Sequence, residues 1–254
     1  MKNIFLSVII PCYNEEANIK KGSLEFINSF LGKKKFTWEV IVSDDGSTDL
    51  GKKIIKGKLE SLKKFRLLEN KHGGKPYAIY QGIRKANGRF VLFTDMDQST
   101  PIGELDKLLP FREMNFEAII GSRGLNRKNF PFYRRLGAVV FMAFRKALIL
   151  PEVNDTQCGF KLFKKIAVEK EFPKLEFFKR DKKIVGWKVT SYDVELLHLI
   201  KKSGGKIKEV VVNWEDEDKS TSKGGSLSRY IKESKDMLRE ILRVKINDMK
   251  GLYE

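Results

Sequence analysis

The chain has 254 residues, enough to bury the core of one large α/β domain or of one domain with a helical appendage. Its 50 basic and 33 acidic residues leave a net charge of +17, which predicts an anionic partner such as nucleic acid, an anionic membrane surface or a phosphorylated substrate, unless the charge serves solubility alone. The two cysteines lack CxxC spacing and support neither a disulfide framework nor a zinc site, which favours a reducing compartment. No apolar stretch approaches the roughly 20 residues of a membrane-spanning helix.

The first 100 residues alternate short apolar runs with amphipathic stretches of helical length. Strands are predicted at "FLSVIIP", "WEVIVSDD", "KFRLLEN" and "RFVLFTD", with helices over 14–31, 54–62 and 75–86. Because the apolar runs show no polar alternation, these strands are expected to be buried on both faces, in a mostly parallel, Rossmann-like α/β sheet with helices on both sides. Ligands of such sheets bind beyond the carboxyl ends of the strands.

The second half continues this pattern and ends in a long basic helix. A strand is predicted at "FEAIIGSR", a helix at "FPFYRRLGAVVFMAFRKALIL", a helix at "YDVELLHLIKKSGG" and a strand at "KIKEVVVNW". The last helix is predicted from about Leu227, so residues 1–225 form one α/β domain and residues 226–254 an amphipathic helical extension. The helix within 130–150 either packs in the core or lies in a membrane interface. The last helix packs on the sheet, on a second copy of the chain or on a membrane.

Polar segments follow three of the predicted strands, and they should meet at one edge of the sheet. One of them places Asp95 and Asp97 together directly after a buried strand. Ser99 or Thr100, with Pro101 after them, is expected to cap the next helix, so the two acids are not needed as caps. Two carboxylates this close suit a hard divalent cation, Mg²⁺ or Mn²⁺, that completes its shell with substrate phosphates.

The segment "SDDGSTD" after another strand offers a second ligand group. Asp45 is placed to accept hydrogen bonds from a nucleotide base or ribose, although the same residues also describe a turn with a helix cap at Ser47 or Thr48. No GxxxxGK[ST] segment occurs, which excludes a P-loop. No GxGxxG follows the first strand, which argues against a nicotinamide-dependent dehydrogenase.

Several motifs occur in an order that resembles family 2 glycosyltransferases of the GT-A fold. They are "SVIIPCYNEEANI", "EVIVSDDGSTD", "NKHGGKPYAIYQGIRKANGRFVLFTDMDQSTP" and "AIIGSR". The later "DTQCGFKLF" and "YDVELLHL" resemble the branch that contains dolichyl-phosphate β-glucosyltransferase and dolichyl-phosphate mannose synthase, and "FTDMDQSTP" with "YDVELL" is more similar to the former.

The resemblance implies roles for the matching positions. The residues that would line the nucleotide are Pro11, Tyr13, Glu15 and Asp45, with Lys75 nearby. Asp95 and Asp97 would hold the metal on the diphosphate of the donor. Arg123, Arg134 and Arg135 would contact phosphates, and Asp155, Gln157 and Gly159 would close the acceptor or sugar side. Asp193 and Glu195 lie where family members that glycosylate hydroxyl groups carry a catalytic base.

The implied reaction moves a hexose, with inversion and metal assistance, from a nucleoside diphosphate sugar to a polyprenyl or dolichyl phosphate at a membrane surface. UDP-glucose is the favoured donor and GDP-mannose the next. A phosphate acceptor is already ionised and needs no general base, and adjacent arginines suit its recognition because guanidinium binds phosphate bidentately. In the alternative, a family 2 transferase of cell-surface polysaccharide synthesis glycosylates a sugar hydroxyl, and Asp193 or Glu195 is the base.

The sequence also departs from the family pattern. The mannose synthase branch commonly has a glutamine four residues after the first acid of the pair, whereas here position 99 is serine and the glutamine is Gln98, so a third side-chain metal ligand is not expected. The membrane segments of many relatives are absent, so attachment is expected to be peripheral, on the cytoplasmic face, or the acceptor is not a lipid. A nucleic-acid-binding module is not expected, because the lysines are scattered and no such motif occurs.

Overall fold

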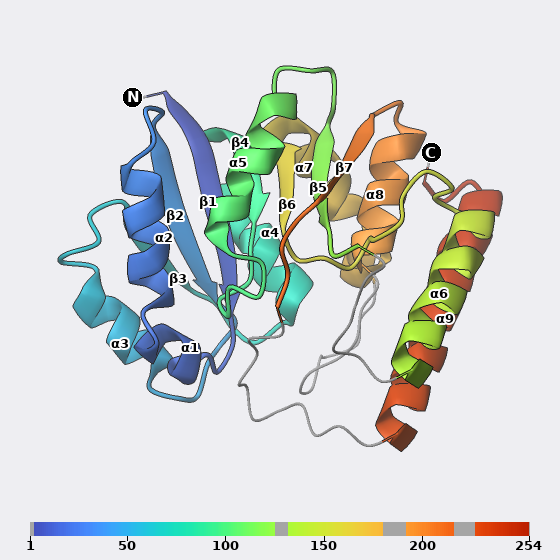
Figure 1. Ribbon diagram of the computed structural model, residues 1–254, viewed down its shortest axis with the longest axis horizontal. Coiled ribbons are helices and arrows are strands. Elements are labelled where there is room, and N and C mark those ends of the chain that lie inside the picture. Colours follow the sequence, from blue (N-terminus) through green and yellow to red (C-terminus); the bar gives the residue numbers. More distant parts are fainter. Residues whose placement is uncertain (1–2, 125–131, 180–191, 216–226, 254) are drawn as a thin grey trace.

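The computed structural model describes residues 3–124, 132–179, 192–215 and 227–253, with the backbone alone for 132–136, 138 and 227–233. In this part of the chain, seven strands form one sheet in the order β3-β2-β1-β4-β6-β5-β7 (Figure 1). The strands are β1 (Ile4–Cys12), β2 (Trp38–Asp44), β3 (Phe65–Glu69), β4 (Gly88–Phe93), β5 (Ala118–Ser122), β6 (Lys161–Lys164) and β7 (Ile207–Val211).

The first four strands are parallel neighbours, as the apolar runs predicted. Every residue of β2 is buried, which explains why its sequence shows no alternation of polar and apolar residues. The register places Cys12 of β1 beside Asp44 of β2, and Ile9 of β1 beside Phe93 of β4. The carboxyl ends of β1, β2 and β4 therefore lie along one edge of the sheet.

The sheet is not parallel throughout, and one of its strands was missed in the sequence. β6 lies between β4 and β5 and is antiparallel to both. It has only four residues, too few for a periodic pattern, and the first three of them end "DTQCGFKLF", which the sequence analysis treated as a motif and not as a strand. Because β6 enters from the opposite direction, its first residues come from the same sheet edge at which β1, β2 and β4 end.

Helices cover both faces of the sheet, and the two apolar cores divide according to the alternation of the strand residues. The helices are α1 (Glu16–Lys20), α2 (Ser23–Gly32), α3 (Gly51–Lys58), α4 (Lys75–Lys85), α5 (Leu105–Leu108), α6 (Phe132–Leu148), α7 (Lys165–Glu171), α8 (Tyr192–Lys202) and α9 (Leu227–Met249), with short 3-10 turns at Ile102–Glu104, Leu109–Phe111, Phe172–Lys174 and Glu176–Lys179. On β1, Val8 packs with α1, α2, α3 and α5, whereas Ile9 packs with α4, α7 and α8.

The single helix predicted over 14–31 is in fact two helices. Gly22 separates α1 from α2 and has a φ of 90°, in the left-handed region that a side chain disfavours. The break turns α2 across the sheet, so that Leu24, Ile27 and Leu31 all reach the core.

The two long helices of the second half lie side by side at the edge of the molecule beyond α8 (Figure 1). α9 buries Ile241 and Val244 in the core that also contains the apolar face of α8. α6 is not buried all round, because Val139 and Val140 are exposed. Within the described residues no helix is both long enough and apolar enough to span a bilayer.

Candidate active site

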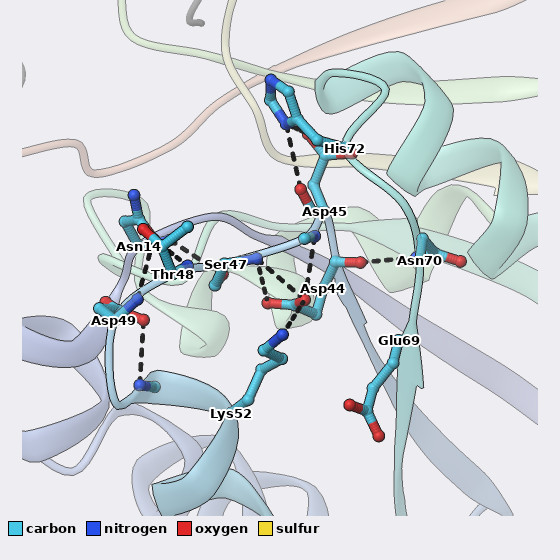
Figure 2. Close-up of polar contacts among 12 residues, drawn as sticks. Asn14, Asp44, Asp45, Ser47, Thr48, Asp49, Lys52, Glu69, Asn70 and His72 are labelled. Carbon is cyan, nitrogen blue, oxygen red and sulfur yellow. Dashed lines mark hydrogen bonds and ion pairs between the residues drawn. The ribbon is translucent and has the colours of Figure 1, made fainter.

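The carboxylates of "SDDGSTD" bind main-chain N–H groups (Figure 2). Asp44 Oδ2 accepts hydrogen bonds from the N–H of Gly46 at 3.0 Å and of Ser47 at 3.1 Å. From the end of β1, Asn14 Oδ1 accepts the N–H of Thr48 at 2.8 Å, and Asn14 itself has a φ of 55°. The loops after β1 and β2 are therefore fixed to each other by side chains that replace missing main-chain partners.

The helix cap expected from Ser47 or Thr48 is supplied by another residue. Asp49 Oδ1 accepts the N–H of Gly51, the first residue of α3, at 3.0 Å, and Asp49 Oδ2 accepts the N–H of Glu16 at 2.9 Å. Ser47 instead accepts the N–H of Asn14 through its hydroxyl at 3.0 Å. The segment can therefore form this turn and also bind a nucleotide, because the hydrogen bonds of the turn do not involve the side chain of Asp45.

Asp45 holds the turn that leads into α4. Its two carboxylate oxygens accept the N–H groups of Gly73 and Gly74, each at 2.8 Å, and its Oδ2 lies 2.9 Å from Nδ1 of His72. Burial raises the pKa of Asp45 above its usual range, although the N–H donors and His72 oppose the shift. Gly74 has a φ of 89°, which allows the tight entry into the helix. The carboxylate of Asp45 therefore helps to position Lys75, which follows Gly74 and is the first residue of α4.

The other residues expected around the nucleotide lie near the ends of β1 and β2. Pro11 is next to the last residue of β1 and pairs with Ser43 of β2. The ring of Tyr13 stacks on His72, with centroids 4.7 Å apart and planes at 25°. Glu15 Oε2 accepts a hydrogen bond from Asn18 Nδ2 at 2.6 Å. Together with Asp45, these side chains surround the exit of two adjacent parallel strands, where doubly wound sheets bind ligands.

Lys75 and Asp95 meet across this edge. Lys75, the first residue of α4, places its Nζ 2.6 Å from Asp95 Oδ1. Partial burial lowers the pKa of Lys75, but the charges of Asp95, Asp193 and Asp97 more than offset this effect and raise the pKa above its usual value. Three carboxylates therefore raise the pKa of one ammonium group, which indicates a strongly negative electrostatic potential at the end of β4.

The chemistry of Asp95 and Asp97 suits a divalent cation. Two of the first four residues after β4, Asp95 and Asp97, supply carboxylate oxygens, the donors that Mg²⁺ and Mn²⁺ prefer. Gly159 approaches so closely that a Cβ atom there would lie 2.1 Å from Asp95 Oδ2. Among the described residues, no group of three acidic, histidine or cysteine side chains could hold a metal by itself. Of the described residues, these two carboxylates would contribute to a cation whose coordination shell substrate phosphate and water can complete.

Gln98 has a structural role in the turn after β4. Its Oε1 accepts the N–H of Ile102 at 3.0 Å, and its Nε2 donates to the carbonyl of Asp95 at 2.8 Å. Gln98 therefore caps the turn that Ser99 or Thr100 was expected to cap. Asp97 Oδ1 accepts the N–H of Ser99 at 2.9 Å, which fixes the second acid of the pair.

Arg123 is paired with Asp155, two residues that had been expected to touch different parts of the substrates. The guanidinium makes a bidentate pair at 2.7 and 2.8 Å, and Asp155 also accepts the N–H of Arg123. The guanidinium lies 5.7 Å from the ring of Trp214. Burial lowers the pKa of Arg123, but Asp155 outweighs it and keeps the group charged. Gln157 donates its N–H to Asp155 Oδ1 at 3.0 Å.

Arg134 and Arg135 belong to the first turn of α6, and their side chains lie outside the described residues. Their predicted contact with phosphate stays a prediction.

The two acids at the start of α8 have separate partners. Asp193 Oδ1 lies 2.6 Å from Nζ of Lys161. Glu195, buried to 1% exposure, accepts hydrogen bonds from Arg243 at 2.8 Å and from the hydroxyl of Tyr253 at 2.6 Å. Glu195 therefore fixes α9 on α8, and of the two acids only Asp193 contributes to the charge around Lys75.

Lys161 was missed in the sequence analysis. Its one signal is a lysine inside the apolar run "CGFKLF", where a buried charge requires a partner.

Three comparisons relate this chain to known proteins. A profile of glycosyl transferase family 2 matches residues 7–172. The dolichyl-phosphate beta-glucosyltransferase of Dictyostelium discoideum is 30% identical over 269 residues, which cover 99% of this chain and 77% of the relative. That of Drosophila melanogaster is 33% identical over 233 residues, which cover 85% and 68%.

Solved structures show the same fold. Mannosyl-3-phosphoglycerate synthase from Rubrobacter xylanophilus superposes with a TM-score of 0.67 at 13% identity, over 98% of this chain and 76% of that one. Glucosyl-3-phosphoglycerate synthase from Mycobacterium tuberculosis, in complex with Mn²⁺ and UDP-glucose, gives a TM-score of 0.62 at 18% identity, over 95% and 79%. The predicted GT-A fold is confirmed, and the chain belongs to glycosyl transferase family 2 and is a glycosyltransferase.

Proposed function

We propose that this enzyme transfers glucose from UDP-glucose to a polyprenyl phosphate of the dolichyl type, with inversion at the anomeric carbon. The observation that carries the proposal is the similarity, over 99% of the chain, to a dolichyl-phosphate beta-glucosyltransferase. GDP-mannose is the second donor to consider, because a mannosyltransferase in complex with GDP-mannose and Mn²⁺ has the same fold at a TM-score of 0.54 and 22% identity.

Asp95 and Asp97 are proposed to hold Mg²⁺ or Mn²⁺. The support is the pair of carboxylates at the end of β4, the close approach of Gly159 and the Mn²⁺ in two structures of the same fold. When bound, such an ion supplies Lewis-acid stabilisation of the diphosphate leaving group.

Residues of this chain would then bind and orient the two substrates. Pro11, Tyr13, Glu15 and Asp45 are proposed to surround the nucleotide, with the Lys75 ammonium beside its diphosphate. Arg123, Arg134, Arg135 and Gln157 are proposed to bind the acceptor phosphate. The pair with Asp155 limits the rotamers of Arg123, so less side-chain entropy is lost when phosphate binds.

The proposed transfer step exchanges one bond for another. An oxygen of the acceptor phosphate attacks the anomeric carbon on the face opposite the diphosphate. The bond between that carbon and the diphosphate oxygen breaks, and UDP leaves with the electron pair. Because the acceptor oxygen is already ionised at neutral pH, the step requires no proton acceptor.

A lipid acceptor requires the enzyme to reach a membrane surface. We propose peripheral attachment on the cytoplasmic face, supported by the net charge of +17 and by exposed apolar residues on α6 and α9, such as Val140 and Met249. The same exposed residues of the 226–254 extension would also suit contact between two copies of the chain.

One extraction assay tests the proposal. The protein is incubated with MnCl₂, radiolabelled UDP-glucose or GDP-mannose, and a polyprenyl phosphate in detergent micelles, and the products are extracted into organic solvent. Label from UDP-glucose alone in the organic phase is the expected result. Label from neither donor, with transfer instead to a sugar hydroxyl acceptor, would contradict the lipid acceptor and favour the polysaccharide alternative.

A further inference from the structure

Lys161 is a buried cation in the short strand β6. Its side chain is only 1% exposed, between Phe160 and Leu162 of the apolar core. The ammonium lies 2.6 Å from Asp193 Oδ1 and also donates to the carbonyl of Cys158. No step of the proposed reaction uses it. A buried charge destabilises the folded state unless it is paired. The contact with Asp193 must therefore offset the free energy that is lost when the Lys161 ammonium leaves water.

Asp193 lies among the other charged groups of the site. Its charge helps to raise the pKa of Lys75, whose ammonium binds Asp95, and that of Arg123. Burial raises the pKa of the neighbouring Tyr192, and Asp193 adds to that shift. The carboxylate that Lys161 holds is therefore one of the charges that surround the proposed diphosphate position.

The segment 155–161 contacts three separate groups of the site. Asp155 at its start binds Arg123 at 2.7 and 2.8 Å. Gly159 lies against the carboxylate of Asp95. Lys161 at its end binds Asp193. Because β6 runs antiparallel to β4, this segment enters the sheet next to the end of β4, and it links α8 to the metal-binding candidates.

We infer that Lys161 is a positioning residue, which holds the carboxylate of Asp193 in place beside the Lys75–Asp95 pair. Asp193 then acts through its position and charge and is not the group that takes a proton from the acceptor. This inference rests on the proposed function and sharpens it, because an acceptor that arrives ionised, as a lipid phosphate does, does not require Asp193 as a base.

The first test compares the kinetics of Lys161→Met, Lys161→Arg, Asp193→Asn and the double variant K161M/D193N. Lys161→Met should lower kcat for transfer roughly 100-fold, with KM for UDP-glucose changed less than about threefold, because the displaced group acts on geometry at the reacting centre. Lys161→Arg should restore most of kcat, since it keeps the charge. Lys164→Met is the matched control: Lys164 is in the same strand but pairs with the partly exposed Glu117 at 3.2 Å, and its removal should leave kcat within about twofold.

Stability separates positioning from a purely structural role. Lys161→Met leaves Asp193 without its buried partner and should lower Tm by about 10 °C, whereas the double variant removes both charges and should regain most of that loss. We expect the double variant to stay as slow as the slower single variant. Recovery of both Tm and kcat in the double variant, or an unchanged kcat in Lys161→Met, would overturn the inference.

An NMR measurement tests the ion pair without any assay of transfer. A buried, paired ammonium exchanges its protons slowly and should give a ¹H–¹⁵N signal near neutral pH, unlike the exposed Lys20. That signal should disappear in Asp193→Asn. A persistent signal in Asp193→Asn, or none in the wild type, would count against the inference. Absence of transfer by the wild type with every donor would instead contradict the proposed function.

Discussion

The two halves of the sheet hold their site residues by different means. At the site end of β1 and β2, the carboxylates of Asp44 and Asp45 bind mainly main-chain N–H groups, as Asp44 binds Gly46 and Asp45 binds Gly73. In the half that contains β5, β6 and α8, side chains bind side chains: Arg123 with Asp155, Lys161 with Asp193 and Arg243 with Glu195.

The difference has a consequence for the stability of the folded protein. When a carboxylate that binds a main-chain N–H group is removed, the N–H group loses its acceptor, but no buried charge is left without a partner. The loss of one member of a buried ion pair leaves the other charge without compensation, which costs several times more. We therefore expect the second half to be the more sensitive to single substitutions.

The largest effect on stability is expected from Arg243→Met. Glu195 is almost completely buried and would lose its charged partner, so the free energy of unfolding should fall by about 3–5 kcal/mol. Urea denaturation measures it. Arg239→Met, one turn earlier on α9 and 75% exposed, is the matched control and should cost less than about 0.5 kcal/mol. Equal losses in the two variants would remove the contrast between the halves.

Gly159→Ala tests how closely the second half must pack against the proposed metal ligand Asp95. The new Cβ would lie 2.1 Å from Asp95 Oδ2, so the carboxylate must move, and Mn²⁺-dependent binding of UDP-glucose should weaken at least about 30-fold, or roughly 2 kcal/mol. Isothermal titration calorimetry measures the affinity. Gly57→Ala on α3, where no atom lies within 4 Å of the added Cβ, should bind as the wild type does. An unchanged affinity in Gly159→Ala would show that Asp95 does not need its present position.

Asp45→Asn tests the first half. Asparagine keeps one acceptor oxygen, so one of the N–H groups of Gly73 and Gly74 loses its partner, and the free energy of unfolding should fall by about 1–2 kcal/mol. Asp106→Asn, in an exposed pair with Lys34, should have almost no effect under the same denaturation. A loss from Asp45→Asn as large as that from Arg243→Met would contradict the expected difference between the halves.

The smallest effect is expected at Asp248 on α9. The hydrogen bond from Lys202, at 2.8 Å, and the nearby His198 ring keep the pKa of Asp248 below its usual 3.8. A carboxyl group with a depressed pKa in the folded state stabilises the protein above the unfolded-state pKa, and this stabilisation is lost as pH falls through the folded-state pKa. Asp248→Asn should therefore cost less than about 1 kcal/mol at pH 7, and the difference from the wild type should shrink as pH falls below about 4. A difference that stays constant with pH would contradict the charge-based account.

The same contrast explains which features could be predicted from the sequence. The strand over Trp38–Asp44 and the helix over Lys75–Lys85 were predicted within about two residues, because a short apolar run indicates the buried strand and helical spacing of apolar residues indicates the helix. The rule for parallel sheets also predicted that the loops after β1, β2 and β4 share one edge, where the structure brings Lys75 to Asp95.

The partners in the second half could not be predicted in this way. Arg123 and Asp155 are 32 residues apart, and so are Lys161 and Asp193. Such pairs depend on the antiparallel insertion of β6, which has no periodic signal of its own. The resemblance to a family indicated Arg123, Asp155 and Asp193 one by one, but only the structure shows which of them bind each other.

The most direct test of the account measures UDP-glucose binding by calorimetry with and without Mn²⁺, in the wild type and in Asp95→Asn and Asp97→Asn. We predict that Mn²⁺ strengthens binding at least about tenfold in the wild type and has no effect in either variant, while both variants keep the Tm of the wild type within a few degrees. Metal-dependent binding that persists in both variants, or binding by the wild type that ignores Mn²⁺, would contradict the claim that these two carboxylates hold the ion on the donor.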